Sequence, residues 1–210
     1  FEYVYFARPD SILDNDSAYE MRLKFGRALA REWLQKKIEV DVVMPIPESS
    51  RPATTSFAET IQKPVREGFI KDRYSGRTFI MPDRASRESA LRLKLNPMSP
   101  EITDKRIVML DDSIVRGTTI GKTLKLVKEK HPAAIHLAIY SPPVLHPCYY
   151  GIDMSIESEL IANQLAQELG YGDHQLTVLQ QRELEIELAH RLEIDSITFL
   201  SVDGLLNAFN

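Results

Sequence analysis

The most constraining stretch of this 210-residue sequence is an apolar run that ends in two adjacent acids, within residues 107–119. Residues 107–110 are all apolar, Asp111 and Asp112 follow directly, and a turn of small and hydroxyl residues leads into helix-forming residues from Ile120. This order predicts a buried strand, a turn and a helix, the repeating unit of an α/β fold. In open α/β sheets, ligands bind beyond the carboxyl ends of the strands, so we expect the two acids at a binding site.

The turn at residues 113–119 is typical of a phosphate-binding loop. Backbone N–H groups at a helix N-terminus attract phosphate, and two carboxylates beside it suit vicinal hydroxyls or a hard divalent cation. The pattern predicts a site for a phosphorylated ribose. An ordinary turn with an Asp N-cap is the better explanation of an isolated acidic pair. Here the strand, Gly117 and the hydroxyls of Thr118 and Thr119 occur together, which favours phosphate.

Strand-like and helix-like segments alternate along the chain. We expect a strand at 3–6, a helix from the capping box at Ser17 to about Lys37, strands at 40–46, 64–71, 107–110 and 135–140, and helices at 52–61 and 120–130. Further on, we expect a helix at 157–168, an added or lengthened helix within 175–193, a strand at 197–201 and a short helix capped by Asp203. The alternation predicts one α/β domain over residues 1–210, with a doubly wound parallel sheet and a helical C-terminal extension. Residues 72–100 have no clear periodicity, and residues 163–193 form a divergent helical segment.

Composition excludes several classes of protein. The formal net charge of −4 gives no electrostatic basis for binding nucleic acid, and no apolar run is long enough to cross a membrane. The single cysteine, Cys148, cannot form an internal disulfide, which favours a reducing, cytoplasmic location. The chain begins at Phe1 rather than Met, so we expect it to be cut from a longer polypeptide.

A second candidate phosphate site lies at residues 44–53, again between a predicted strand and a predicted helix. Ser49 and Ser50 supply hydroxyls there, Arg51 supplies a fork of N–H donors, and Glu48 precedes them. A Pro-rich turn with a Ser N-cap explains the segment alone equally well. Its position one strand–helix unit before the acidic pair favours a pyrophosphate site.

A long basic segment follows at residues 71–94, with seven Lys or Arg residues against three acids. Such a run is usually a solvated face or a nucleic-acid tail, whereas long loops of this kind are often lids. A basic lid fits a substrate that carries a phosphate and a pyrophosphate, because cations there stabilise the charge that builds on the departing pyrophosphate. The best catalytic candidates, which the sequence does not rank, are Arg73, Tyr74, Arg77 and Lys94.

Residues 107–119 resemble the phosphoribosyl pyrophosphate (PRPP) loop of type I phosphoribosyltransferases. Four further stretches, at residues 1–11, 71–82, 92–96 and 150–154, resemble the glutamine PRPP amidotransferase branch of that family. The resemblance runs from Phe1 to about Ala162 and resumes near Ile194. It implies the type I phosphoribosyltransferase fold and the first committed step of purine synthesis, in which ammonia displaces pyrophosphate from PRPP to give 5-phosphoribosylamine.

The resemblance also implies roles for particular residues. Asp111 and Asp112 would hold the ribose hydroxyls, Mg²⁺ would map to Ser49, Asp111 and Asp112, and pyrophosphate would bind at residues 48–51. The 5′-phosphate would lie in the loop that includes Ser113, Arg116, Gly117, Thr118 and Thr119. Cys148 lies where cluster-bearing relatives have one iron–sulfur ligand, but a cluster normally takes four cysteines, so none is expected in this chain.

Partners are implied in the same way. Relatives carry an N-terminal glutaminase domain that supplies ammonia, are inhibited by purine nucleotides, and form homo-oligomers. Two rival functions remain open at this point: a non-catalytic PRPP-sensing regulator, and a phosphoribosyltransferase with a base as acceptor. The match at residues 71–82 favours the amidotransferase over both.

Overall fold

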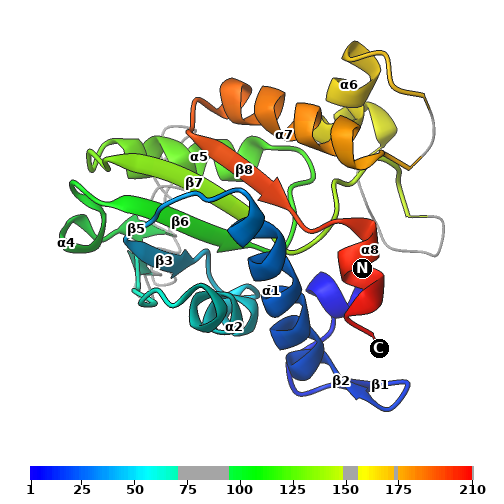
Figure 1. Cartoon of the computed structure of the whole chain (residues 1–210), viewed down its shortest axis with the longest axis horizontal. Helices are drawn as coiled ribbons and strands as arrows, with labels where there is room; N and C mark the ends of the chain where they lie inside the picture. Colours follow the sequence, from blue (N-terminus) through cyan, green and yellow to red (C-terminus); the bar gives the residue numbers. More distant parts are fainter. Residues whose placement is uncertain (71–94, 149–155, 173–174, 210) are drawn as a thin grey trace, which may run out of the picture.

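Four parallel strands form the centre of the computed structural model, which describes residues 1–70, 95–148, 156–172 and 175–209 (Figure 1). Their order is β3 (Val42–Pro45), β6 (Arg106–Asp111), β7 (Ala134–Ile139) and β8 (Ser196–Phe199). Beyond β3, Val65 pairs with Val43 in parallel, through a Val43 N–H to Pro64 O bond of 3.0 Å. Val65 thus lies on one side of β3, and β6, which comes later in the chain, lies on the other side. This reversal confirms the doubly wound topology, with its switch point between β3 and β6.

Alternate residues of each strand pack on opposite faces of the sheet. In β6, Ile107 and Met109 belong to the core cluster under α5 (Thr118–Lys128), α6 (Ile161–Glu168) and α7 (Val178–Leu192). Val108 and Leu110 belong to the cluster under α1 (Ala18–Gln35) and α2 (Arg51–Ile61). Figure 1 shows the resulting three layers, with helices on both faces of the sheet.

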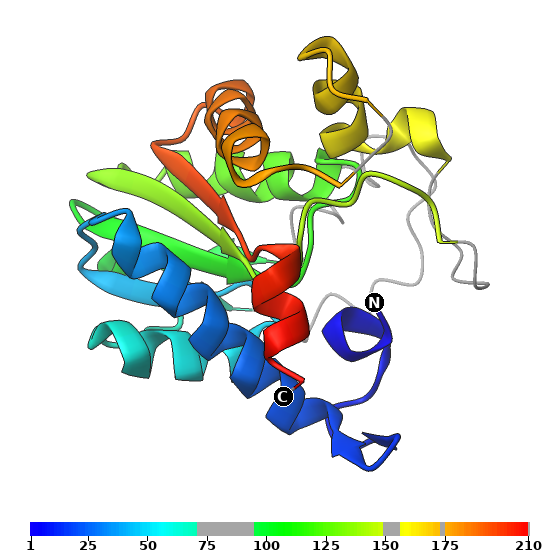
Figure 2. The same cartoon turned by 45° about the vertical axis from the view of Figure 1, so that its right-hand side comes forward.

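Several short strands and helices lie outside the central sheet and its main covering helices. A hairpin joins β1 (Ile12–Leu13) to β2 (Asp16–Ser17), and β4 (Phe69–Ile70) pairs antiparallel with β5 (Asn96–Pro97) before the short helix α4 (Ser99–Ile102). A 3₁₀ turn, η3 (Glu157–Glu159), precedes α6, and α8 (Val202–Asn207) ends the fold. Figure 2 shows η1 (Glu2–Phe6) and α8, the first and last described helices, beside α1. None of the helices in these ranges combines the length and apolar character needed to cross a bilayer.

Most predicted elements are confirmed within a few residues. The predicted cap at Ser17 starts α1, where the Ser17 hydroxyl accepts a hydrogen bond from the Glu20 N–H at 3.4 Å. The added helix expected within residues 175–193 is α7, which begins with a capping box formed by Thr177 and Gln180. These helices have strong local start signals, so sequence alone located them.

The strand predicted at residues 3–6 is wrong: Glu2–Phe6 forms a π-helical turn, η1. The buried guanidinium of Arg22 in α1 donates to the carbonyl oxygens of Tyr3 at 3.0 Å, Tyr5 at 3.1 Å and Ala7 at 2.7 Å. In an extended strand the carbonyls of Tyr3 and Ala7 would lie about 13 Å apart, which is too far for one guanidinium to reach both. Tertiary hydrogen bonding therefore overrides the strand preference of these aromatic residues.

Three other predictions need correction. Of the strand predicted at residues 64–71, only Val65 and β4 are strand-like within the described residues 64–70. The helix expected at 157–168 is broken at Leu160, which is buried in extended backbone between η3 and α6. The final helix is capped by Ser201 rather than Asp203, because the Ser201 hydroxyl accepts from the Gly204 N–H at 2.9 Å.

Side chains cover the outer backbone of β8, the last strand of the sheet. The Phe199 N–H donates to Glu185 of α7 at 2.8 Å, and the Gln181 amide donates to the Phe199 carbonyl at 3.0 Å. Lys36, just after α1, forms an ion pair with Glu185 at 2.5 Å and donates to Thr198 at 2.9 Å. Both backbone polar groups of Phe199 at this edge are therefore satisfied within the chain.

Candidate functional site

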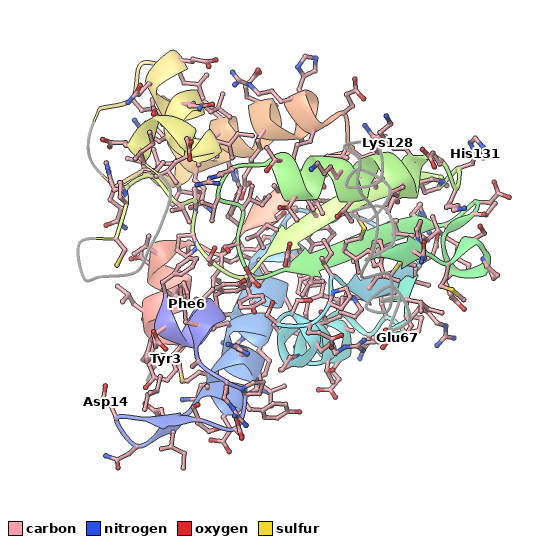
Figure 3. The ribbon with its side chains drawn as sticks, turned by 180° about the vertical axis from the view of Figure 1, so that it is seen from behind. Tyr3, Phe6, Asp14, Glu67, Lys128 and His131 are labelled. Atoms are coloured by element: carbon pink, nitrogen blue, oxygen red, sulfur yellow. The ribbon has the colours of Figure 1, made fainter. Side chains whose placement is uncertain are left out.

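A pocket of about 570 Å³ lies where β3 and β6 end, at the switch point of the sheet. The acidic pair, the loop after β6 and the loop after β3 form its wall together with the N-terminal turn. Figure 3 places Phe6, one of the lining residues, on η1, at the opposite end of the molecule from Lys128 and His131. The pocket thus occupies the position at which open α/β sheets bind ligands.

The two acids accept hydrogen bonds from neighbouring groups inside this pocket. Asp112 accepts bonds from the Ser49 hydroxyl and from the Ser113 hydroxyl at 2.7 Å. The Asp112 N–H donates to the Asp111 carboxylate at 2.9 Å. Ser49 follows β3, whereas Asp111 ends β6 and Asp112 follows it. The Ser49–Asp112 bond therefore joins the two candidate phosphate sites that were predicted separately.

The electrostatics of the pair favour binding of a hydroxyl or a cation. Burial and the neighbouring Asp112 raise the pKa of Asp111 well above its ordinary range. Burial also raises the pKa of Asp112, while the Ser49 and Ser113 hydroxyls and the charge of Arg22 oppose that increase. Burial makes it unfavourable for these two carboxyl groups to carry a charge without a partner. A group that donates hydrogen bonds to them, or a cation that neutralises them, is therefore expected to bind.

The loop after the acids leads directly into a helix, as predicted. Helix α5 begins at Thr118, two residues before the predicted start, and Gly117 is its N-cap with φ of 75°. Ser113, Arg116, Gly117, Thr118 and Thr119 all line the pocket. Arg116 also forms an ion pair with Glu159 at 2.9 Å. Since the first N–H groups of a helix have no partner within it, this loop is suited to an anion.

Gly117→Ala is expected to destabilise the fold by about 1–3 kcal/mol. A Cβ at residue 117 would lie 2.6 Å from Cδ1 of Ile161, and the positive φ is strained for alanine. Gly121→Ala, in the same helix, is the matched control, because nothing lies within 4 Å of its added Cβ. The control is expected to stabilise α5 by about 0.5–1 kcal/mol. Urea unfolding of both variants checks the pair, and equal stability of the two would contradict the argument.

The loop after β3 contributes to the pocket only in part. Ser49 lines it, whereas the Ser50 hydroxyl is buried and donates to the Ile46 carbonyl at 2.5 Å. Arg51 pairs with Glu48 at 3.1 Å and also with Glu67, and neither Arg51 nor Glu48 is among the pocket-lining residues. Of the residues predicted for pyrophosphate, the structure therefore brings only Ser49 to the acids.

The four predicted catalytic residues, Arg73, Tyr74, Arg77 and Lys94, lie outside the described residues. Leu95, the next residue along the chain, does line the pocket. Cys148 is half-buried. Within the described ranges, no group of three or more His, Cys, Asp or Glu side chains is arranged to hold a metal ion.

Three contributions to the site were not among the residues predicted from the sequence. Phe1, Tyr5 and Phe6 line the pocket, although Tyr5 and Phe6 were predicted only as part of a strand. Tyr140, directly after β7, donates to the carbonyl oxygen of Ser49 at 3.2 Å. Arg22 is only 1% exposed, and its positive charge acts on Asp112.

Arg22 carried a sequence signal that could have revealed it. It occupies the apolar stripe of α1, where Ala18, Phe25 and Leu29 recur at helical spacing. A charged residue at such a position must find buried partners. Tyr140 carried no comparable signal, because an apolar strand commonly ends in an aromatic residue.

Comparisons with known proteins agree with this geometry. The family described as "Phosphoribosyl transferase domain" matches residues 18–141. An amidophosphoribosyltransferase from Synechocystis sp. is 41% identical over 206 residues, which cover 98% of this chain and 37% of the relative. A second, from Methanothermobacter thermautotrophicus, is 43% identical over 206 residues and matches 98% of this chain and 39% of its own length. The chain thus spans about two fifths of these curated relatives.

A solved structure has the same fold. The glutamine PRPP amidotransferase of B. subtilis, complexed with ADP and GMP, superposes with a TM-score of 0.78 at 40% identity. The match covers 100% of this chain and 41% of the B. subtilis chain. The residues matched by the family include both loops of the pocket.

Proposed function

Because this chain belongs to the phosphoribosyltransferase domain family, we propose that it is the phosphoribosyl-transfer part of an amidophosphoribosyltransferase. Its substrate would be 5-phosphoribosyl 1-diphosphate (PRPP), and its acceptor would be ammonia. The observation that carries the proposal is the bond between Ser49 and Asp112, which joins the loops after β3 and β6 at the switch point of the sheet. One pocket can thereby hold a pyrophosphate, a ribose and a 5′-phosphate together.

The pocket residues supply the binding energy for this substrate. Asp111 and Asp112 accept hydrogen bonds from the ribose 2′- and 3′-hydroxyls, and bonds to charged acceptors are the stronger kind. The loop from Ser113 to Thr119 takes the 5′-phosphate at the start of α5. Ser49 faces the pyrophosphate. These contacts fix the anomeric carbon of the ribose between the two loops and orient it for displacement.

In the proposed reaction, the nitrogen lone pair of ammonia forms a bond to C1 of the ribose. The C1–O bond to pyrophosphate breaks, and its electron pair leaves with the pyrophosphate. Inversion at C1 gives 5-phosphoribosylamine, and the surplus proton passes from the new ammonium group to solvent. Arg73, Tyr74, Arg77 and Lys94 remain our candidates for stabilising the charge on the leaving pyrophosphate.

The acid pair and Ser49 fit a magnesium ion bound together with substrate. Their oxygens are hard donors, and Mg²⁺ commonly takes one or two carboxylates plus substrate phosphates rather than a cage of protein ligands. When bound, the ion neutralises charge on the pyrophosphate and orients it. The pairing of the two acids without a third acidic ligand in the described ranges fits a cation that arrives with PRPP.

Other partners follow from the relatives. In a full-length protein, a glutaminase part would release ammonia from glutamine and pass it to this pocket. Purine nucleotides are proposed as inhibitors, since the B. subtilis structure contains ADP and GMP. We also propose a homo-oligomer, a cytoplasmic location in keeping with the single Cys148, and no iron–sulfur cluster.

The first test mixes the protein with PRPP, Mg²⁺ and ammonium chloride and follows pyrophosphate release. We expect release that requires ammonia and is lost in Asp112→Asn, because the variant removes a charged acceptor in the pocket. Exposed Asp203, in the first turn of α8, gives Asp203→Asn as the control with wild-type release.

Each of the other possible results of this test leads to a different conclusion about the function. PRPP binding without release would favour a sensor, or a domain that works only with its glutaminase part, and adding a relative's glutaminase part with glutamine separates these two. Release that depends on a purine or pyrimidine base rather than ammonia would identify a base-accepting transferase. Absence of both binding and release would contradict the proposed function.

A further inference from the structure

Tyr140 connects the pocket to the N-terminal turn through one hydroxyl group. It directly follows β7, it is fully buried, and its N–H donates to the Asp111 carbonyl at 3.2 Å. Its hydroxyl lies 3.1 Å from the carbonyl oxygen of Val4 in η1 and 3.2 Å from that of Ser49. The Tyr140 side chain therefore touches the backbone of two separate segments that border the same pocket.

A tyrosine hydroxyl has a single hydrogen to donate, and both neighbours here are acceptors. Val4 and Ser49 therefore share one donor. Burial raises the pKa of Tyr140 well above its ordinary value, so the hydroxyl keeps this hydrogen throughout the physiological pH range. Its ring is fixed by stacking on Phe25 of α1, with centroids 6.5 Å apart.

The hydroxyl acts on the residue that binds Asp112. Ser49 accepts from Tyr140 through its main-chain oxygen and donates to Asp112 through its side chain. The backbone bond limits where the Ser49 hydroxyl can lie, because the side chain is one covalent bond from that backbone. Among the described residues, the loop after β3 has no other side chain that reaches the acids.

We propose that Tyr140 is a positioning residue that holds the loop after β3 in place for the pyrophosphate half of the substrate. This inference rests on the proposed function, since it takes the Ser49 side of the pocket as the pyrophosphate site. Tyr140 touches no reacting atom. It acts through the Ser49 backbone, and the position of η1 affects the site because Val4 shares the same donor.

Two probes separate positioning from general stability. Isothermal titration calorimetry measures the binding of pyrophosphate with Mg²⁺, which reports on the Ser49 side, and of ribose 5-phosphate, which reports on the acids and the loop at residues 113–119. In Tyr140→Phe we expect pyrophosphate binding to weaken about tenfold, the equivalent of about 1.4 kcal/mol. Ribose 5-phosphate binding should change less than about twofold, because its loops keep their contacts.

Tyr3→Phe is the matched control. The Tyr3 hydroxyl also donates to a main-chain carbonyl, that of Leu13 at 2.5 Å, but the residue does not line the pocket. We expect both probes to bind this control as they bind wild type. Thermal unfolding of each variant verifies that the proteins are folded at the titration temperature.

Three results would overturn the inference. Unchanged pyrophosphate binding in Tyr140→Phe would show that the bond does not position the loop. Equal weakening for both probes would assign Tyr140 a purely structural role. A wild-type protein that binds neither probe would instead refute the proposed function, and this inference with it.

Discussion

Asp111→Asn is expected to make the protein more stable and a poorer catalyst at the same time. Burial and Asp112 raise the pKa of the Asp111 carboxyl, so its charge at neutral pH destabilises the folded state. Asparagine removes that charge and keeps an oxygen able to accept the 2.9 Å bond from the Asp112 N–H. We expect a gain of about 0.5–2 kcal/mol in unfolding free energy at pH 7, the usual range for relieving a functional site.

The activity of the same variant should fall about 10- to 100-fold in kcat/KM. Asp111 is proposed to accept a hydrogen bond from a ribose hydroxyl, and such bonds to charged groups contribute about 1.5–3 kcal/mol. Pyrophosphate release measures the loss, and urea unfolding measures the gain. A variant that loses stability together with activity would contradict the conclusion that the charge of Asp111 destabilises the folded state.

The stability gain should depend on pH in a defined direction. A carboxyl whose pKa is raised on folding contributes stability that is present below its unfolded pKa, about 3.9, and is lost as pH rises through the folded value. Asparagine does not ionise, so the variant does not lose stability in this way as pH rises. The difference between Asp111→Asn and wild type should therefore be near zero at pH 3.5 and larger at pH 7.

Asp41→Asn is the control of opposite sign. Hydrogen bonds from Arg106 lower the pKa of Asp41 to about 2, so its charge stabilises the fold above its ordinary pKa and that stability is lost as pH falls toward 2. Asp41 precedes β3, at the end of the sheet away from the pocket. We expect this variant to be slightly less stable at pH 7, with unchanged pyrophosphate release.

Arg22→Met is expected to cost about 3–5 kcal/mol of unfolding free energy, the range for removing one partner of a buried charged arrangement. The carbonyls of Tyr3, Tyr5 and Ala7 would lose their shared donor inside the fold. Methionine fills a similar volume, so the effect reports the lost hydrogen bonds and charge rather than a cavity.

The same variant should also open the N-terminal wall of the pocket. Without Arg22, η1 loses the hydrogen bonds that tie it to α1. Tyr5 and Phe6, the residues of η1 that line the pocket, would then leave their positions in its wall. Limited proteolysis should cleave near the N-terminus faster than in wild type. The loss of a nearby positive charge should also raise the pKa of Asp112 further.

Arg27→Met is the control on the same helix. Arg27 is exposed, and an exposed substitution of this kind changes stability by less than about 0.5 kcal/mol. Arg22→Lys should fall between the two, because lysine keeps the charge but lacks the planar fork of donors. Equal stability of Arg22→Met and Arg27→Met would refute the role given to the buried guanidinium.

The parts of this molecule that sequence predicts best are those whose cause is local. The strand ending at Asp111 is an apolar run stopped by charge, and α1 and α7 begin with capping residues a few positions from their partners. The parallel, doubly wound sheet also followed from the alternation, since parallel strands need helical crossovers. In the site, the acids and the loop at residues 113–119 were located because they are contiguous in sequence.

The parts that sequence does not predict depend on distant contacts. The helical form of Glu2–Phe6 results from Arg22, fifteen or more residues away, and the break at Leu160 coincides with a bond from the Ile161 N–H to the Val115 carbonyl at 3.0 Å. Tyr140 joins the site from 91 residues beyond Ser49. Neither propensity nor periodicity encodes such pairings.

Arg51 shows that acidic neighbours can engage a cation that was predicted to bind a ligand. Its position and chemistry suggested an anion ligand, but Glu48 and Glu67 occupy its guanidinium in this structure. Glu67 is distant in sequence and lies in the segment after α2 (Figure 3). A cation near a predicted anion site is thus weak evidence of a ligand contact until its acidic neighbours are known.

The covered backbone of β8 bears on how this protein behaves when many copies are present together. An uncovered outer strand is a template onto which another chain can add a strand, which is the first step toward domain swapping and fibre growth. Here Gln181 and Glu185 satisfy both polar groups of Phe199, and Lys36 holds Glu185 in place. Two copies that collide at this border find no free backbone hydrogen-bonding groups at Phe199, so a strand from a second copy cannot pair with the sheet at that residue.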